Sequence, residues 1–93
     1  MVAVHREDDL RHCGAQTIVT GQGTVRANGK LIAVVDDKCS HGDGDLVSTS
    51  PGTVIIEGKK LIVVTDTNTA GDNALHNTPE TDPDTGSPDV NAY

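Results

Sequence analysis

An internal repeat is the feature that most restricts how this chain can fold. Residues 21–37 (GQGTVRANGKLIAVVDD) placed over residues 50–66 (SPGTVIIEGKKLIVVTD), a shift of 29, give eight identical pairs in seventeen positions. Unrelated segments of ordinary composition would give roughly one. The chain therefore contains two copies of one structural unit.

Each copy has the pattern of a β-hairpin. A short Thr-Val strand leads to a two-residue turn, Asn28-Gly29 or Glu57-Gly58, and a strand rich in β-branched residues then ends at an Asp. Asn-Gly is a strong hairpin signal, because a type I′ turn needs positive φ at both central residues. Glu-Gly is a weaker signal, and the second hairpin is predicted from the repeat.

The same shift extends the repeat toward the N-terminus. It places Asp8 on Asp37 and His12 on His41. The N-terminal residues therefore look like the end of another copy whose first strand is absent.

The repeat also extends toward the C-terminus. Residues 86–90 (GSPDV) resemble the start of the second copy and predict the beginning of a third hairpin that the chain leaves unfinished. We expect a single domain over residues 1–93, with units at about 1–20, 21–49 and 50–85 and a partial third hairpin at 86–93.

Three loops connect the predicted hairpins. From the Asp to the Val of the next strand the spacing is 17 residues in two units and 24 in the third: Asp8 to Val25, Asp37 to Val54, and Asp66 to Val90. The third loop thus carries an insertion of seven, and its composition predicts an irregular segment over 67–85 with disorder as the alternative. We expect a mainly β, conical body with a pseudo-threefold repeat and its loops at one end.

Composition indicates that burial alone is a weak source of stability here. The 93 residues include no Phe and no Trp, so Val, Ile, Leu and Ala must form the core. Small scaffolds commonly add a disulfide, a structural metal or a partner subunit. Two Cys and four His supply the side chains for the first two.

Charge and hydropathy exclude several classes of function. A net charge of -7, with no Lys or Arg after Lys60, argues against nucleic-acid binding, which needs clustered cations. No apolar run is long enough to span a membrane, and residues 1–9 are charged too early for a signal peptide. We expect synthesis in the cytoplasm.

Metal-ligand residue types recur in the loops. His12 and His41 hold equivalent positions in the alignment, and Cys39 lies two residues before His41 in the same loop. Structural zinc sites use four Cys or His ligands. A pseudo-threefold arrangement would direct these loops at one axis, which predicts a shared metal ion.

The order of these elements resembles the PAAR-repeat family. GQGTVRANGK, SPGTVIIEGK and GSPDV are similar to the start of its repeat, and the resemblance is strongest from Thr20 to Asp66. The Pro-Ala-Ala-Arg tetrad is replaced by residues 31–34 (LIAV) and 60–63 (KLIV), which identifies the chain as a divergent member.

The resemblance implies a metal-pinned tip. The family forms a small cone with a metal, usually zinc, held near its apex by three His and one Cys. In this chain it implies the ligands His12, Cys39, His41 and His76, with Zn²⁺ expected and iron as the alternative. Cys13 competes with Cys39 as the thiolate, and a Cys13–Cys39 disulfide is a further alternative. His5 aligns with Val34 and is expected to be structural or exposed, outside the site.

The resemblance also implies a partner and a machine. PAAR proteins cap a trimeric β-helical spike, of the phage-tail type or the VgrG type of type VI secretion systems, and sharpen it for envelope penetration. We expect Val25, Val54 and Val90 near the base that docks on this spike, a monomer in isolation, and transient contact with the target envelope. Small size and the lack of an appended toxin domain favour a virion tail tip, with the secretion tube as the alternative.

No catalytic motif accompanies these features. Glu7, Glu57 and Glu80 belong to no recognisable acid–base pattern, and HExxH and Gly-rich phosphate loops do not occur in the sequence. We do not expect an enzyme. The alternative function is a free-standing metal-binding or redox module that uses Cys13 and Cys39.

Overall fold

The computed structural model describes residues 2–42, 44–49, 54–69 and 78–92, which form short antiparallel strand pairs, as the mainly β prediction requires. The principal extents of the molecule are 31 × 25 × 24 Å. Its elements are β1 (Val2–Ala3), β2 (Thr17–Ile18), β3 (Arg26–Ala27), β4 (Lys30–Leu31), β5 (Lys38–Cys39), β6 (Leu46–Val47), β7 (Ile55–Ile56), β8 (Lys59–Lys60), β9 (Thr67–Asn68), the 3-10 helix η1 (Thr78–Thr81) and β10 (Asn91–Ala92). Within the described ranges, no helix has the length and apolar character that crossing a membrane needs.

Two of the strand pairs are the predicted hairpins. β3 pairs with β4, and β7 pairs with β8, each across a two-residue turn. Asn28 and Gly29 have φ values of 54° and 81°, and Glu57 and Gly58 have 50° and 86°. These are the positive φ values that a type I′ turn requires, so both hairpin predictions are confirmed.

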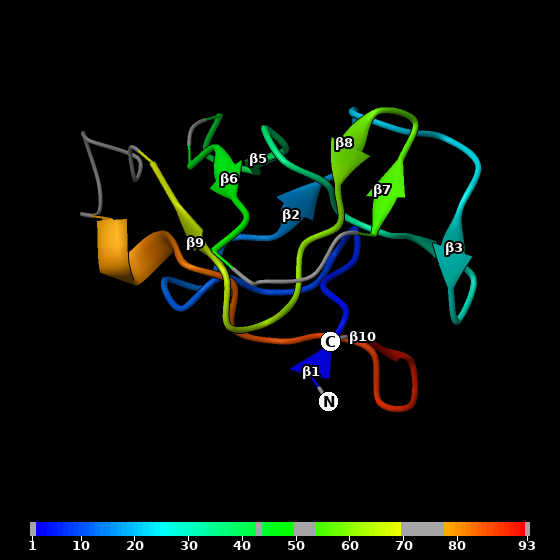
Figure 1. The fold of residues 1–93 in the computed structure, drawn as a ribbon. Coiled ribbons are helices and arrows are strands. Elements are labelled where there is room, and N and C mark those ends of the chain that lie inside the picture. The colour runs from blue at the N-terminus through cyan, green and yellow to red at the C-terminus, as the bar shows by residue number, and fades with distance from the viewer. Residues whose placement is uncertain (1, 43, 50–53, 70–77, 93) are drawn as a thin grey trace.

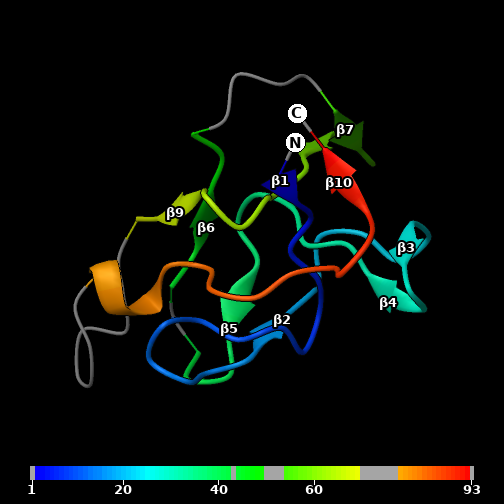
Figure 2. The same cartoon turned by 90° about the horizontal axis from the view of Figure 1, so that it is seen from below.

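The two ends of the chain form a third pair of the same kind. β10 pairs antiparallel with β1, with Val2 opposite Ala92 and Ala3 opposite Asn91. The two ends of the chain consequently lie side by side (Figures 1 and 2). The strand that the N-terminal copy lacks is thus supplied by the C-terminal segment.

A closed circuit of backbone hydrogen bonds joins the three units. His5 N donates to Ile62 O at 2.9 Å, Ile62 N to Ala33 O at 3.0 Å, and Ala33 N to His5 O at 2.9 Å. Isolated bridges flank the circuit in the same cyclic order: Val4 with Val63, Arg6 with Ile32, and Val34 with Leu61. The strands therefore run around a pseudo-threefold axis.

A β-turn closed by an Asp side chain ends each unit. The Asp37 amide donates to Val34 O at 3.2 Å, and Asp37 Oδ2 accepts the Val34 amide at 2.9 Å. The same reciprocal pair joins Asp66 to Val63, and Asp9 to Arg6. The other carboxylate oxygen of Asp37 accepts the amides of the segment leading to the next hairpin, at Thr20 and Gly21.

These turns correct the alignment of the N-terminal copy. Asp9, and not Asp8, is the equivalent of Asp37, so the shift here is 28 residues where the later copies are related by 29. Asp8 corresponds instead to Asp36, and both adopt positive φ inside the turn, at 67° and 76°. The one-residue difference is absorbed in the following loop, because Thr17 and Leu46 are again 29 apart and make matching backbone bonds.

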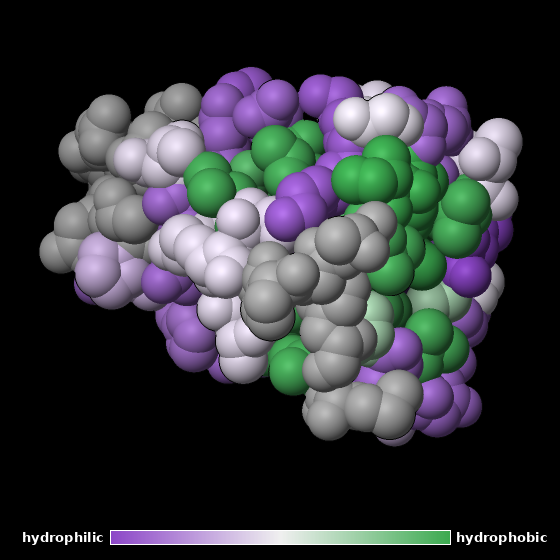
Figure 3. Space-filling view, in the orientation of Figure 1, coloured by the Kyte–Doolittle hydropathy of each residue, from purple (hydrophilic) through white to green (hydrophobic). Residues whose placement is uncertain are grey.

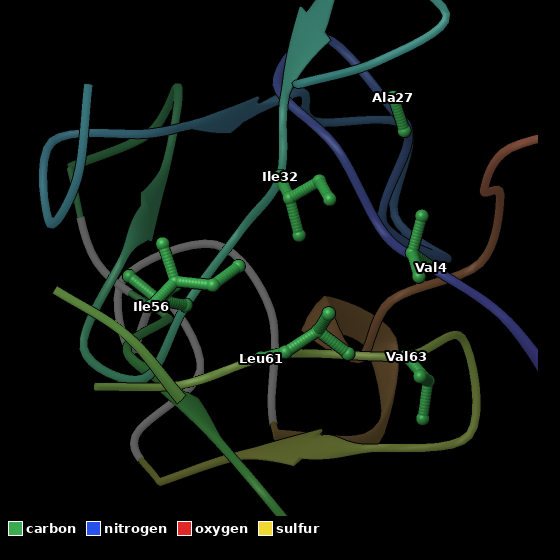
Figure 4. Packing of buried hydrophobic residues seen from close by; sticks show 7 residues of the cluster. Val4, Ala27, Ile32, Ile56, Leu61 and Val63 are labelled. Carbon is green, nitrogen blue, oxygen red and sulfur yellow. The ribbon is translucent and has the colours of Figure 1, made fainter. Parts of the chain in front are cut away.

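The core lies between the hairpins and consists of the aliphatic residues that the composition predicted. Figure 4 shows side chains from separate segments gathering in the space that those segments enclose. The main cluster is Val4, Ala27, Ile32, Val34, Ile56, Leu61 and Val63, and a second cluster is Ala33, Leu46 and Ile62.

The three loops lie away from the hairpins. We call residues 10–16, 38–45 and 67–82 the first, second and third loops. Cyclic pairing also joins them, because β2 pairs with β5, β6 pairs with β9, and Arg11 bridges Pro83. In Figure 1 the β3–β4 and β7–β8 hairpins lie on the right, whereas β6, β9 and η1 lie on the left. The molecule thus has a hairpin end and a loop end.

The Asp turns generate a stability prediction. Asp37→Ala removes the acceptor of the Val34, Thr20 and Gly21 amides, so we expect it to lower the free energy of unfolding by about 3 kcal/mol in urea denaturation. Asp36→Gly is the matched control, because it relieves a positive φ and removes only an exposed contact with Lys59. Equal losses in the two variants would contradict this account of the turn.

Candidate functional site

Three buried side chains occupy equivalent positions at the start of the loops. Arg11, Cys39 and Asn68 each lie two residues after the Asp of their unit, and each is at most 3% exposed. The backbone of each residue forms an antiparallel β pairing with a buried residue of another segment: Arg11 with Pro83, Cys39 with Thr17, and Asn68 with Leu46. This ring brings all three loops together around the axis.

Arg11, a residue of the first loop, bonds to the other two loops and to Thr17, which directly follows the first loop. Its Nη1 donates to Gly44 O in the second loop at 2.9 Å and to Thr81 O in the third at 2.8 Å. Its Nε donates to Thr17 Oγ1, where the first loop ends, at 2.6 Å. One side chain therefore crosslinks the whole loop end.

The charge of Arg11 has no carboxylate partner at ion-pair distance within the described ranges. Burial lowers its pKa, and the neighbouring Cys39 and Cys13 sulfurs, followed by Asp37 and Asp82, act in the opposite direction. Arginine stays protonated at neutral pH despite such a shift. The loop end thus encloses a positive charge held mainly by neutral oxygen acceptors.

His5 continues the network from Arg11 toward the axis. Its Nδ1 lies 2.6 Å from Thr85 O, an oxygen that can only accept, so Nδ1 carries the proton. Its Nε2 must then accept from Thr17 Oγ1, at 2.5 Å, while that oxygen accepts from Arg11 Nε. The neutral imidazole is fully buried, and desolvation lowers its pKa to about 4.

The structure distributes the predicted metal ligands over different environments. Cys39 is buried, whereas His12 and His41 are exposed. His12 Nδ1 lies 3.4 Å from Asp84 Oδ1, and the His12 side chain is 52% exposed. His76 lies outside the described residues, so the four-ligand set as a whole stays a prediction.

The corrected alignment removes one argument for that set. His12 is three residues after Asp9, whereas His41 is four residues after Asp37, so the two are not equivalent positions. Among the residues in the described ranges, no three His, Cys, Asp or Glu side chains form a group suited to a metal ion.

Cys39 is the buried member of the predicted metal-ligand set, and a guanidinium lies near its thiol. A Cβ on Gly44 would lie 3.0 Å from Arg11 Nη1 and 3.6 Å from Cys39 Sγ, so the guanidinium and the thiol are close neighbours. A dication on this sulfur would lie beside an unpaired buried cation in a medium of low dielectric. Within the described residues, the guanidinium beside Cys39 therefore disfavours a metal ion on this sulfur.

Both cysteines are free thiols. Cys13 is partly exposed and Cys39 is fully buried, so the structure does not contain the disulfide considered from the sequence.

Sequence reasoning missed Arg11, Thr17 and His5 as a site. In the corrected alignment His5 corresponds to Ala33 and Ile62, and not to Val34, so a His replaces an apolar residue on the axis. It is structural, as one of the two expectations held. A polar residue aligned with apolar ones was the available signal, and it is present in either alignment.

The predicted interface valines hold matching places on the three hairpins. Val25 O accepts from Ile32 N at 3.0 Å, Val54 O from Leu61 N at 3.0 Å, and Val90 O from Val4 N at 3.1 Å. Val25 and Val54 are 41% and 43% exposed, and the adjacent Ile55 is 54% exposed. Figure 3 shows apolar surface gathered at the upper right, where Figure 1 places the β7–β8 hairpin.

Comparison with known proteins gives no relative. No protein-family model matches the chain, and neither do the curated proteins or the solved structures.

His5 predicts an acid-sensitive fold. Its pKa is 6.5 when unfolded and about 4 when folded, so the native state resists protonation and stability is lost as pH falls from 6.5 to 4. The loss amounts to about 3 kcal/mol by urea denaturation across this range. Arg6, Arg11 and Asp9 also act on this imidazole.

The control for this prediction replaces His5 with the apolar residue type of its equivalents. His5→Val is expected to flatten the stability profile between pH 6.5 and 4, whereas His12→Asn at the surface should leave its slope in place. An unchanged slope in His5→Val would assign the acid sensitivity to other groups.

The two thiols predict a difference in reactivity. With a colorimetric disulfide reagent we expect Cys13 to react in the native protein and Cys39 to react only after unfolding, because Cys39 has no exposed surface. Cys13→Ser should then show no native reaction. Rapid modification of both thiols would contradict the burial of Cys39 and favour the redox alternative.

Proposed function

We propose that this protein is a divergent PAAR-like tip of the central spike of a contractile injection machine. In this role the hairpin end docks on a trimeric β-helical spike protein and the loop end leads during envelope penetration. A phage tail is the first candidate and a type VI secretion tube the alternative. The role is mechanical and involves no catalytic step.

The observation that carries the proposal is the threefold repetition at the hairpin end. Val25, Val54 and Val90 accept equivalent backbone bonds from Ile32, Leu61 and Val4. A chain that repeats one backbone pattern three times around an axis suits a partner with three identical chains, because each chain of the partner can then meet an equivalent strand pair. The sequence resemblance points to the same kind of partner.

Exposed apolar surface and strand edges support docking at this end. Val25, Val54 and Ile55 expose between 41% and 54% of their surface. The first strands of the hairpins, β3, β7 and β10, each pair with one neighbour in the described residues, so their other edges are open. Open edges and apolar side chains are the features through which one β-structure extends another.

A closed arrangement suits a tip under axial load. Each unit is bonded to both neighbours through the circuit of His5, Ala33 and Ile62, so a force on one hairpin is shared by all three. The β10–β1 pair closes the arrangement at the chain ends. Such a body resists splaying without a large core.

Binding to the spike tests this function. With a purified trimeric β-helical spike protein, we expect one chain per trimer by light scattering after gel filtration. Val54→Lys with Ile55→Lys should abolish the complex, because charged side chains cannot replace this apolar contact. Leu10→Lys is the control, since Leu10 is also exposed, at 39%, but lies in the first loop. Loss of binding only in the Leu10 variant, or no complex at all, would reject the proposal.

A further inference from the structure

The described part of the loop end contains little buried apolar surface that could hold the loops together. In the described residues, the buried members of the second apolar cluster are Ala33, Leu46 and Ile62. The first and third loops meet through a few backbone bonds, such as His12 N to Asp82 O at 3.1 Å. A metal ion was the crosslink expected from the sequence.

We infer that the guanidinium of Arg11, and not a metal ion, holds the three loops together. It bonds to Thr17 Oγ1, Gly44 O and Thr81 O at 2.6 to 2.9 Å, one acceptor at the end of the first loop and one in each of the others. The planar guanidinium directs its donors outward in fixed directions, which a single ammonium cannot reproduce. This inference is independent of the spike-tip function.

The second loop is shaped around the guanidinium. Gly44 has a φ of +81°, and a Cβ there would lie 3.0 Å from Arg11 Nη1, closer than side chains normally approach. A residue with a side chain would strain the backbone and displace the donor from its acceptor. Gly44 therefore lets the loop carbonyl approach the cation.

The positive charge of the Arg11 guanidinium disfavours a metal ion on the neighbouring Cys39 sulfur. Arg11 is 1% exposed, and its Nη2 has no hydrogen-bond partner among the described residues. Within those residues no carboxylate lies at ion-pair distance from the guanidinium, so none of them pairs directly with its charge. A second cation on the adjacent Cys39 sulfur would be repelled in this buried setting.

His5 and Thr17 fix the orientation of the guanidinium. Thr17 Oγ1 accepts a hydrogen bond from Arg11 Nε and donates its own O–H to His5 Nε2. His5 Nδ1 in turn donates to Thr85 O. Each donor in this series of hydrogen bonds has one acceptor, so the plane of the guanidinium has one favoured orientation. A preorganised fork loses little conformational freedom when it binds its acceptors.

The first test uses the wild-type protein. Elemental analysis of protein purified without added metal should find less than about 0.1 equivalent of zinc or iron, and the Tm should be the same with and without EDTA, since no structural metal contributes folding energy. One equivalent of metal whose removal lowers the Tm would overturn the inference.

The second test replaces Arg11 with Lys and follows amide hydrogen exchange by NMR. The His12 and Thr69 amides, which donate to Asp82 O and Asp45 O between loops, should exchange at least about tenfold faster, as loss of one charged hydrogen bond implies. The Ile32 and Leu61 amides of the hairpins should change less. Arg26→Lys is the matched control, because Arg26 is exposed and donates to Gly29 O within its own hairpin.

Other outcomes decide the matter as well. Unchanged exchange of the His12 and Thr69 amides in Arg11→Lys would reject the inference. If that variant fails to fold while Arg26→Lys folds, the wild-type metal measurement still decides between guanidinium and metal. Spike binding is read separately through Val54 and Ile55, so either proposal can fail without the other.

Discussion

Three backbone hydrogen bonds in a closed circuit determine the arrangement of everything else in this protein. His5, Ala33 and Ile62 each donate to one unit and accept from the other, so no unit is an end and none has a free edge at the axis. Strands that leave the circuit on one side form the hairpins, and those that leave on the other side lead into the loops. The hairpin end and the loop end thus follow from one small set of main-chain bonds.

The three units place different kinds of side chain around this circuit. Around the axis the second and third units place Ala, Ile and Val where the first unit places His5 and Arg6. Arg6 forms a bidentate pair with Asp9, at 2.9 and 3.0 Å, where the equivalent residues Val34 and Val63 pack in the core. The first unit is split between the chain ends, and directional bonds hold it where the others rely on apolar contact. The acid sensitivity that we predict follows from the presence of His5 at a position where the other two units have an apolar residue.

The hairpins could be predicted because their signals are local. Asn28-Gly29 specifies its own turn, and the repeat transfers that assignment to Glu57-Gly58, whose positive φ is further supported because the Glu57 carboxylate accepts from Gly23 N and Thr24 Oγ1 of the neighbouring unit. The loop end could not be derived in this way. The first loop is one residue shorter than the second, which leaves the sequence spacing almost unchanged but places Arg11 at the axis in place of His12. The turn at Asp9 sets the register of the first loop, and this register buries Arg11 and leaves His12 exposed.

The pairing of β1 with β10 has a consequence for how the chain acquires its structure. Val2 and Ala92 are the most distant partners in the described sequence, and they must meet before the third strand pair is complete. Contacts of such high sequence separation carry a loop-closure cost and slow folding. During synthesis, β1 can pair with β10 only after residues 91–92 have left the ribosome, so this pair is expected to form late.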